Sequence, residues 1–493
     1  MTTTWDVIVV GAGTAGMPTA TFAALRGARV LLIEQAERVG GTLWYSGGQM
    51  SAADTRLQRS RGIEDSAAEH FRDIMRITRQ TSEPVLLELF TDHAGAAFDW
   101  LMDNGFDVAA ECPACLDVHE PYRTRRSVWG NEGGLSVMKA LKRALDREIA
   151  RGAVTLKLSS ELTGFLRAPN GAVIGVQVRD RRTGVSAEHR GENVVLTTGG
   201  YVANRELYER YSPGTPYGVA SNPEAKGTGF ALAAALGARV KGGEMALPSY
   251  GCVLEDPKDR SSQRFIGGPH DALSAYIWLE TSPQRRRPWE IHVNLRGERF
   301  VREDIPSVDH RECALRDQPD WRFFILFDEG IRQNAPKITT RWSEAALKGA
   351  FGTHPSFLVD DSLNGLARQM GVDEAALSRT VAEYNAAVAS GLDAKFGREF
   401  LPRAIAKPPF YAVQCFGLQV MSPAGLDVDA DLRVLDQAGK PIGSLYAAGE
   451  VLGHWRIAGD AYAPGTSVTP AITFGKMLGE RLLSWSNARA AAE

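Results

Sequence analysis

The sequence lacks an excess of charge of either sign. Its 493 residues include 56 Lys and Arg residues and 59 Asp and Glu residues, which gives a formal net charge of −3. A chain without a strong positive field does not attract nucleic acid or an anionic membrane surface by charge alone. We therefore expect no nucleic-acid partner.

Cysteine is scarce, and long apolar runs are missing. Five cysteines in a chain of this length do not form a disulfide framework and fit a reducing compartment. Gly, Arg or Glu interrupts every apolar run before it reaches the roughly 20 residues that a membrane span needs. The first six residues carry no basic region or cleavage site of an export signal. These absences predict a cytoplasmic protein with no membrane span.

Glycine, by contrast, is abundant at 50 residues and marks the first motif. An apolar run over residues 5–10 precedes a glycine turn, which an Ala-rich helical segment (17–26) and a second apolar run (29–33) follow. This order predicts a βαβ unit whose turn approaches a pyrophosphate closely and whose helix directs backbone amides at it. Glu34 ends the second run, where a carboxylate binds ribose hydroxyls. The turn glycines are Gly11, Gly13 and Gly16.

The segments that follow favour FAD over NAD. A second glycine-rich loop comes directly after Glu34 and suits the rest of a pyrophosphate and the edge of an isoalloxazine ring. Far downstream, LYAAGE (445–450) and GTSVTPAITFG (465–475) lead into the last helix, whose N-terminus would place partial positive charge near a reduced flavin. The loop contains Gly40, Gly41, Thr42, Ser46, Gly47 and Gly48.

A change of composition divides the chain into three segments. Residues 242–403 are richer in Trp, Arg and Pro and contain no second phosphate-binding glycine turn. We expect residues 242–403 to form a domain inserted between residues 1–241 and 404–493. The expected fold class is α/β, with a Rossmann-like βαβ unit at the start of the chain.

Taken together in this order, GAGTAG, GGTLWYSGG, TTGGY, NLRGERF, LYAAGE and GTSVTPAITFG resemble the fumarate reductase/succinate dehydrogenase flavoprotein superfamily. The resemblance spans nearly the whole chain. It implies a Rossmann-like FAD-binding domain formed by residues 1–241 and 404–493, an α+β capping, substrate-binding domain formed by residues 242–403, and an active site between the two. The residues that match the FAD contacts of that superfamily are Gly11, Gly13, Ala15, Gly16, Glu34, Gly41, Thr42, Gly47, Gly48, Thr198, Gly199, Glu450, Ser467 and Val468.

The departures from the superfamily pattern concern the reaction. Gly41 occupies the position of the flavin-linked histidine of succinate dehydrogenases, so the FAD is expected to be non-covalent. Ser307 replaces the proton-donating arginine of fumarate reductases, and Tyr462 replaces their second substrate-binding arginine. No carboxylate-binding histidine is evident in LQVMSPAG (418–425). A C4 dicarboxylate would therefore lose the groups that bind it.

The segment Tyr462 to Ser467 is similar to 3-ketosteroid dehydrogenases, which place a tyrosine just before this glycine turn. A phenol there, together with the backbone amide of Gly465, can donate hydrogen bonds to a ketone oxygen and acidify the adjacent C–H bond. The resemblance implies that a base removes that proton while the neighbouring carbon passes a hydride to FAD. The expected product is an α,β-unsaturated ketone.

The base itself is left open. The ketosteroid dehydrogenases carry a tyrosine where this chain has Ser307, and serine is a poor base. The alternatives are Tyr122 in HEPYRTRR, His310, and Tyr276 in the cap, which also remains a candidate for substrate binding. Arg126 and Arg456 are candidates for binding a substrate carboxylate, as are Arg123 and Arg125. If one of them faces the flavin, an oxocyclohexanecarboxylate is favoured, whereas an apolar site favours steroids or simple cyclic ketones.

No metal site and no second nucleotide site is expected. Cys112 and Cys115 form a single CxxC without a second pair, and the glycine pair at 226–238 lacks a preceding strand. Electrons must then pass to an external acceptor, a quinone-linked chain or oxygen. The leading hypothesis is a FAD-dependent dehydrogenase that desaturates a cyclic ketone. The alternatives are an ene-reductase of the fumarate or urocanate reductase type, and a non-catalytic flavoprotein that serves as a binding partner.

Overall fold

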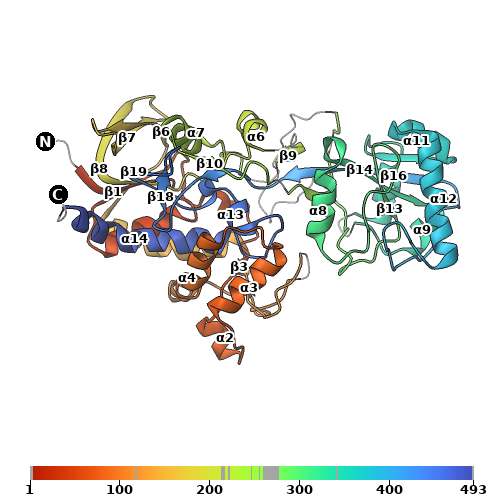
Figure 1. The fold of residues 1–493 in the computed structure, drawn as a ribbon, viewed down its shortest axis with the longest axis horizontal. Coiled ribbons are helices and arrows are strands. Elements are labelled where there is room, and N and C mark those ends of the chain that lie inside the picture. Colours follow the sequence, from red (N-terminus) through yellow and green to blue (C-terminus); the bar gives the residue numbers. More distant parts are fainter. Residues whose placement is uncertain are drawn as a thin grey trace.

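The structure is a computed structural model that describes residues 4–116, 119–212, 217–219, 222–245, 247–254, 256–258, 277–339 and 342–490. It has two lobes arranged along one long axis (Figure 1). The N- and C-terminal ends of the chain both lie at the end of the first lobe that is far from the second. The first lobe is therefore built from both ends of the sequence.

An eight-stranded sheet forms the centre of the first lobe. Its strands follow the order β18-β19-β8-β1-β2-β5, and β7 pairs with both β8 and β6. The pairs β1–β2, β1–β8, β2–β5 and β8–β19 are parallel. The strands are β1 (Thr4–Val10), β2 (Val30–Ile33), β5 (Val154–Lys157), β6 (Ser160–Arg167), β7 (Val173–Asp180), β8 (Ser186–Leu196), β18 (Arg433–Leu435) and β19 (Pro441–Ala447).

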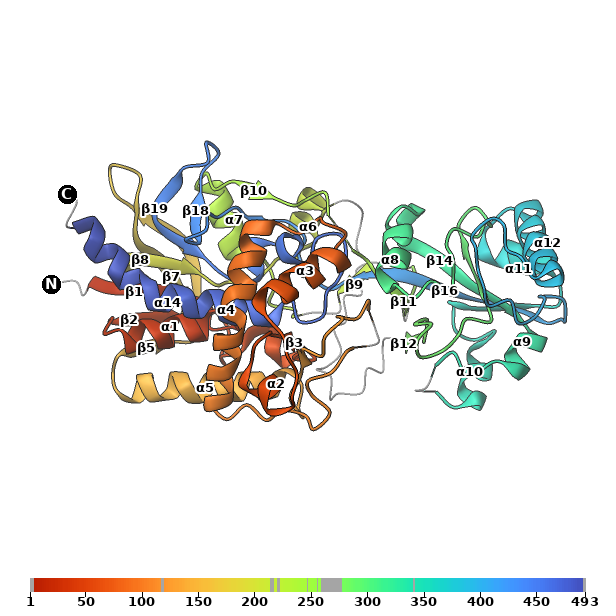
Figure 2. The same ribbon diagram turned by 60° about the horizontal axis from the view of Figure 1, so that its bottom comes forward.

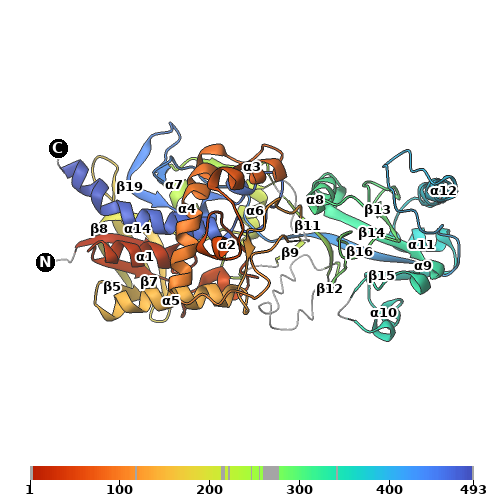
Figure 3. The same ribbon diagram turned by 90° about the horizontal axis from the view of Figure 1, so that it is seen from below.

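The βαβ unit predicted from the sequence is present at the start of this sheet. Residues 7–10 of β1 pair in parallel with residues 30–33 of β2, and all eight are buried. The connecting helix α1 (Gly16–Leu25) is almost entirely buried and packs along α14 (Val468–Ala490), as Figure 3 shows. The two helices approach each other closely at Gly475, which has no side chain. A Cβ at this position would lie only 2.3 Å from the Ala15 carbonyl oxygen. Small residues thus fix the helix layer beneath the nucleotide turn.

Other helices and short strands of the first lobe surround this unit. Helix α4 packs against α14, α3 and α13, and α5 packs against α1 (Figure 2). These elements are η1 (Gly41–Trp44), β3 (Met50–Ser51), α2 (Arg56–Ser60), α3 (Ala67–Ile77), α4 (Pro84–Asp103), β4 (Ser127–Val128), α5 (Gly134–Ala150), α6 (Arg205–Tyr211), α7 (Thr228–Ala235), β10 (Val240–Lys241), β17 (Gly425–Leu426), η3 (Glu450–Leu452) and α13 (Trp455–Ala458).

The second lobe is a seven-stranded sheet with helices around it. Its order is β12-β11-β16-β14-β13, and β9 and β15 also pair with β16. The strands are β9 (Tyr217–Val219), β11 (Ser249–Val253), β12 (Ile277–Trp278), β13 (Ile291–Asn294), β14 (Arg322–Asp328), β15 (Phe357–Asp360) and β16 (Phe410–Gln419). The helices are α8 (Val308–Arg316), η2 (Pro319–Trp321), α9 (Glu329–Asn334), α10 (Glu344–Ala350), α11 (Leu363–Met370) and α12 (Glu374–Ser390).

Strand β16 extends the sheet of the capping lobe past residue 403, where the composition predicts the inserted segment to end. The strand begins at Phe410 and pairs with β11, β14, β15 and β9. The proline-rich stretch just before it resembles a domain boundary, but the apolar strand FYAVQCFGLQ returns to the centre of the second sheet. The described helices include none with the length and apolar character needed to cross a membrane.

Candidate functional site

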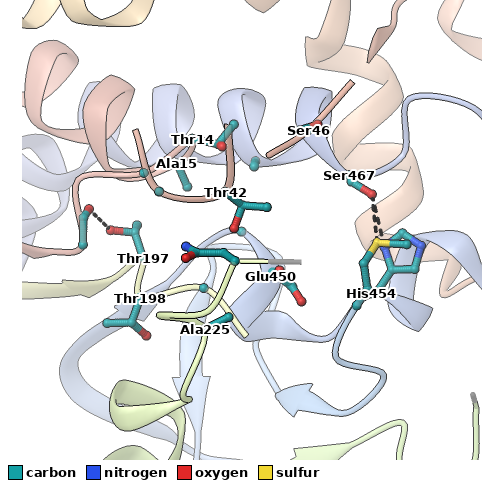
Figure 4. Close-up of a pocket in the computed structure, with 18 of the residues that line it drawn as sticks. Thr14, Ala15, Thr42, Ser46, Thr197, Thr198, Ala225, Glu450, His454 and Ser467 are labelled. Atoms are coloured by element: carbon teal, nitrogen blue, oxygen red, sulfur yellow. Dashed lines mark hydrogen bonds between the residues drawn. The ribbon is translucent and has the colours of Figure 1, made fainter. Parts of the chain in front are cut away.

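A cavity of about 1140 Å³ extends through the first lobe and reaches the second. Ligand pockets commonly measure about 300–1,000 Å³, so this one can take a large cofactor and a further small molecule. Figure 4 shows part of its wall, with residues from the two glycine loops, from the segment after β8 and from the start of α14.

The turn after β1 requires glycine at its first position. Gly11 has φ +105°, and a Cβ there would lie 2.4 Å from the Thr197 carbonyl oxygen. The next residues, Gly13 to Ala15, line the cavity just before α1 begins. Backbone amides at a helix N-terminus carry partial positive charge, which stabilises a pyrophosphate.

Glu34 lies beside this turn at the end of β2 and also lines the cavity. Its carboxylate accepts hydrogen bonds from the backbone amides of Ala12, at 2.7 Å, and Ala36, at 2.9 Å. Burial raises the pKa of Glu34, and these amides oppose the rise. The carboxylate is therefore fixed in place, and its remaining acceptor capacity is available to the hydroxyls of a ribose.

The second glycine loop lies against the first. A Cβ at Gly41 would lie 3.3 Å from the Cα of Gly13, and Gly41, Thr42 and Gly47 line the cavity. Beyond β8, Thr198 and Gly199 also line it, and the buried hydroxyl of Thr198 has no partner within the described part of the chain. This unpartnered polar atom, together with the fixed carboxylate and the close-fitting turns, fits a bound FAD.

Three further residues with predicted FAD contacts form the other wall of the cavity. Glu450, Ser467 and Val468 line it, with Val468 as the first residue of α14. The Glu450 carboxylate accepts from the Ser422 amide at 2.9 Å. Two of the predicted contact residues do not line the cavity: Gly16 packs against Gly11, and Gly48 packs against Gly133.

Tyr462 also lines the cavity. Burial raises the pKa of its phenol, while the backbone amide of Gly465 and the Ser467 hydroxyl act in the opposite direction. The phenol therefore keeps its proton at neutral pH and serves as a donor. Its backbone amide donates to Asp309 of α8 at 2.8 Å, so the capping lobe holds the segment that carries it.

Two histidines flank the Tyr462 ring. The His119 ring centroid lies 4.7 Å from it, and the His454 ring stacks on it at 5.9 Å. Burial lowers the pKa of His454 to about 4, so this imidazole is neutral at neutral pH. Its Nδ1 lies 3.4 Å from the Ser467 hydroxyl, a contact visible in Figure 4.

Two acidic residues of α8 lie next to His119. Asp309 Oδ1 is 3.4 Å from His119 Nδ1, and Glu312 lines the cavity with His119. One side-chain nitrogen or oxygen atom from each of His119, Asp309 and Glu312 lies within 4.8 Å of those of the other two residues. Sequence reasoning missed this cluster, although His119 begins the HEPYRTRR loop, and the i, i+3 spacing of Asp309 and Glu312 places them on one face of a helix.

The predicted base candidates lie elsewhere. Tyr122 is buried behind the site: its phenol donates to the Pro464 carbonyl at 2.6 Å and contacts the Ser51 hydroxyl at 3.2 Å. Burial raises its pKa, so its proton stays in that hydrogen bond. His310 is exposed, Ser307 directly precedes α8, and neither lines the cavity. Tyr276 lies outside the described residues.

The two arginines predicted to bind substrate are instead held by acidic residues. Arg126 is buried and pairs with Asp65 and Asp73, both at 2.8 Å. Arg456 reaches the cavity wall, but its guanidinium group pairs with Glu83 at 2.6 Å and Asp427 at 3.0 Å. Breaking such a buried pair costs about 3–5 kcal/mol, which opposes the release of either side chain to a ligand.

Comparison with known proteins agrees with this geometry. The family model described as "FAD binding domain" matches residues 6–467. A fumarate reductase (cytochrome) of Shewanella frigidimarina is 29% identical over 484 residues, which span 98% of this chain and 78% of the relative. A 3-oxosteroid 1-dehydrogenase of Mycobacterium tuberculosis is 24% identical, over 96% of this chain and 97% of the relative.

Among solved structures, the 3-ketosteroid delta1-dehydrogenase of Sterolibacterium denitrificans, in complex with 1,4-androstadiene-3,17-dione, has the same fold. Its TM-score is 0.74 at 21% identity, over 98% of this chain and 100% of that one.

Proposed function

The chain belongs to the FAD-binding oxidoreductases of the fumarate reductase family, and from this premise we propose that it desaturates a neutral cyclic ketone. In the proposed reaction a proton and a hydride leave adjacent carbons of the ketone, and the product is an α,β-unsaturated ketone. Bound FAD supplies the two-electron acceptor, and a quinone-linked chain or oxygen would reoxidise it.

The observation that carries this proposal is the position of Tyr462 in the cavity wall. A buried phenol that keeps its proton can donate a hydrogen bond to a carbonyl oxygen. Negative charge accumulates on that oxygen when the neighbouring carbon loses its proton, so the bond strengthens in the transition state. The amide of Gly465, which faces the phenol oxygen, holds the tyrosine in this place.

The ion pairs of the two predicted arginines support a neutral substrate. Arg456 is neutralised by Glu83 and Asp427, and Arg126 is buried against Asp65 and Asp73. Apolar side chains contribute wall surface instead, among them Leu247, Val420 and Met421. A ketosteroid or a simple cyclic ketone suits this lining better than an oxocyclohexanecarboxylate, because neither of these guanidinium groups is free to bind the carboxylate.

Reduction of an activated C=C bond is the second candidate. The fumarate reductase of Shewanella frigidimarina supports it, because it is more similar in sequence than the 3-oxosteroid dehydrogenase. The same donor at Tyr462 would activate an enone toward hydride transfer, since the chemistry of the two directions is the same. The acceptor would be an enone or a urocanate-like enoate rather than fumarate, because Arg126 and Arg456 are held in ion pairs and cannot bind the two carboxylates of fumarate.

Anaerobic mixing of the oxidised holoenzyme with candidate substrates separates these functions. We expect the visible absorbance of the oxidised flavin to bleach with ketosteroids or saturated cyclic ketones and not with succinate. If no ketone bleaches the flavin, and an enone or enoate reoxidises the dithionite-reduced enzyme, the reductase is the function. The 4-oxocyclohexanecarboxylate ion is the matched test of charge, because it adds one carboxylate to cyclohexanone.

A further inference from the structure

Tyr462 is a hydrogen-bond donor and does not itself account for the proton that leaves carbon. Of the residues predicted from the sequence as the base, Tyr122, His310 and Ser307 do not line the cavity. Tyr276 lies outside the described residues. His119 does line the cavity, 4.7 Å from the Tyr462 ring between ring centroids. Its Nδ1 faces Asp309, whose Oδ1 also holds the Tyr462 backbone amide. One carboxylate thus lies against the imidazole and holds the backbone amide of the residue that carries the phenol.

The acidic pair is buried, yet each member lies beside His119. Asp309 is 1% exposed, and its second carboxylate oxygen has no hydrogen-bond partner among the described residues. Glu312 is 5% exposed and lines the cavity. A buried carboxylate without full hydrogen bonding is costly and is stabilised by a neighbouring proton or cation. The cluster is therefore built to hold a proton that it can share.

We propose that His119, positioned by Asp309 and coupled to Glu312, is the group that exchanges a proton with the substrate carbon. This inference rests on the proposed function and names the acid–base group that the reaction needs. In the oxidative direction one C–H bond breaks and its proton passes to the free ring nitrogen of His119. Bound FAD would accept the hydride from the adjacent carbon, and a C=C bond would then join the two carbons.

The electrostatics of the cluster agree with this role. Burial lowers the pKa of His119, but Asp309 and then Glu312 raise it above its usual value, while Arg311 opposes them. Burial raises the pKa of Glu312 to about 8. The Tyr462 ring lies 4.7 Å from the His119 ring, and burial keeps its phenol protonated by raising its pKa. Asp460, on the same segment as Tyr462, is paired with Arg316. Because each charge acts on the pKa of the other group, His119 and Glu312 titrate as a coupled pair that can share one proton.

The central test compares His119→Gln with His310→Gln in the holoenzyme. His310 is an exposed histidine on the adjacent helix and serves as the matched control. We expect His119→Gln to slow anaerobic flavin bleaching by about 10²–10⁴-fold, the range for loss of general acid–base catalysis, with FAD content unchanged. His310→Gln should match the wild type. Equal rates for His119→Gln and the wild type would overturn the proposal while leaving the proposed function intact.

The pH profile gives a readout that a purely structural role would not move. Neutral His119 is the base, so oxidation should speed up as pH rises through its raised pKa, and reduction of an enone should slow down. Asp309→Asn keeps an oxygen for the Tyr462 amide but removes a charge that raises the pKa of His119. The pH at which the oxidation rate rises should therefore be lower in Asp309→Asn than in the wild type. If the rate rises at the same pH in both proteins, the proposal is contradicted.

A measurement independent of turnover keeps the inference testable if no ketone is oxidised. Nitrogen-15 NMR of histidine-labelled holoenzyme follows each imidazole, and the His119 signals are those missing from His119→Gln. We expect them to titrate above the usual pH for histidine and to shift downward in Asp309→Asn. If His119 titrates at or below the usual pH for histidine, Asp309 and Glu312 do not raise its pKa, and the proposed role of the cluster is refuted. Loss of activity on EDTA treatment, restored by Zn²⁺, would instead identify the three residues as metal ligands and overturn the proton role.

Discussion

Gly11 is the glycine of the nucleotide turn that combines a positive φ with a close backbone approach. Its φ is +105°, and only 2.4 Å would separate a Cβ from the Thr197 carbonyl oxygen, which leaves no room for a side chain. In Gly11→Ala the strain of about 1–3 kcal/mol should weaken FAD binding by about 5- to 150-fold. The ratio of flavin to protein absorbance after purification, and a fluorescence titration of the apoprotein with FAD, measure this loss.

The control for that substitution is Gly349→Ala. Gly349 lies within α10, and nothing lies within 4 Å of a Cβ there. Alanine in a helix interior is more favourable than glycine by about 0.5–1 kcal/mol, so this variant should keep its FAD and be slightly more stable. Equal FAD affinity in both variants would show that the turn does not approach the cofactor.

Tyr462 gives the second prediction at this scale. In Tyr462→Phe the ring and its packing against His119 and His454 remain, and the donor is lost. We expect the rate of flavin reduction by the ketone to fall about 10²–10³-fold, as for loss of one oxyanion donor. Tyr384→Phe is the control, because the buried Tyr384 hydroxyl has no partner among the described residues. An unchanged rate in Tyr462→Phe would remove the phenol from the mechanism.

At the scale of elements, a buried charge cluster joins the segment after β13 to the segment after α12. Glu303 pairs with Arg299 at 2.6 Å and Arg398 at 3.3 Å, and Arg299 also pairs with Asp393. Burial alone would raise the pKa of Glu303, but Arg398 and Arg299 lower it to about 2. Since the folded-state value lies below the ordinary 4.5, this carboxylate stabilises the fold above about pH 4.5.

That stabilisation should be lost as pH falls from about 4.5 toward 2, and it amounts to about 3 kcal/mol. At pH 7, Glu303→Gln should lower the free energy of unfolding by about 3–5 kcal/mol, because it leaves buried arginine charge uncompensated. The difference between wild type and variant should narrow on acidification. Thermal unfolding across pH measures it, with the exposed Glu298→Gln as control. A difference independent of pH would contradict the assigned pKa.

Elements that depend on neighbouring residues in the sequence could be predicted from the sequence. Strands that pair with strands far away in the sequence could not be assigned to a sheet in this way. The βαβ unit over residues 4–33 is local: apolar β-branched strands flank a glycine turn and an Ala-rich helix. Strand β16 has an equally apolar sequence, but its partners begin at Tyr217, Ser249, Arg322 and Phe357. Nothing in residues 410–419 themselves specifies those partners, so composition placed the boundary too early in the chain.

The same limit applies to the site. Gly11, Glu34 and Thr42 could be predicted because each belongs to a short motif whose geometry is nearly fixed. The cluster at His119 joins a loop after α4, the helix α8 and the segment before α14, which are far apart in the sequence. Tyr122 is three residues from His119 and has the more familiar chemistry, yet its phenol points to Pro464 and away from the cavity.

For the whole molecule, the position of the capping lobe over the cavity depends on α8. Asp309 of this helix accepts from the Tyr462 amide, and Arg316 pairs with Asp460 at 2.5 Å. Asp460 also pairs with Arg79 of the first lobe at 3.2 Å. One carboxylate thus bridges cations from both lobes. These ion pairs are partly exposed, so each stabilises the closed arrangement by less than about 1 kcal/mol.

Asp460→Asn should therefore loosen α8 without unfolding either lobe. We expect amide hydrogen exchange in α8 to become up to about 10-fold faster, which corresponds to about 1.4 kcal/mol, while α1 and β1 exchange as before. The substrate KM should rise by a similar factor with FAD content unchanged, because Tyr462 and His119 are brought together by the docked helix. Asp317→Asn, which removes an exposed carboxylate 3.9 Å from Arg316, is the control. If exchange in α8 is unaffected by Asp460→Asn, the contact of Asp309 with the Tyr462 backbone is sufficient to hold the lobes together.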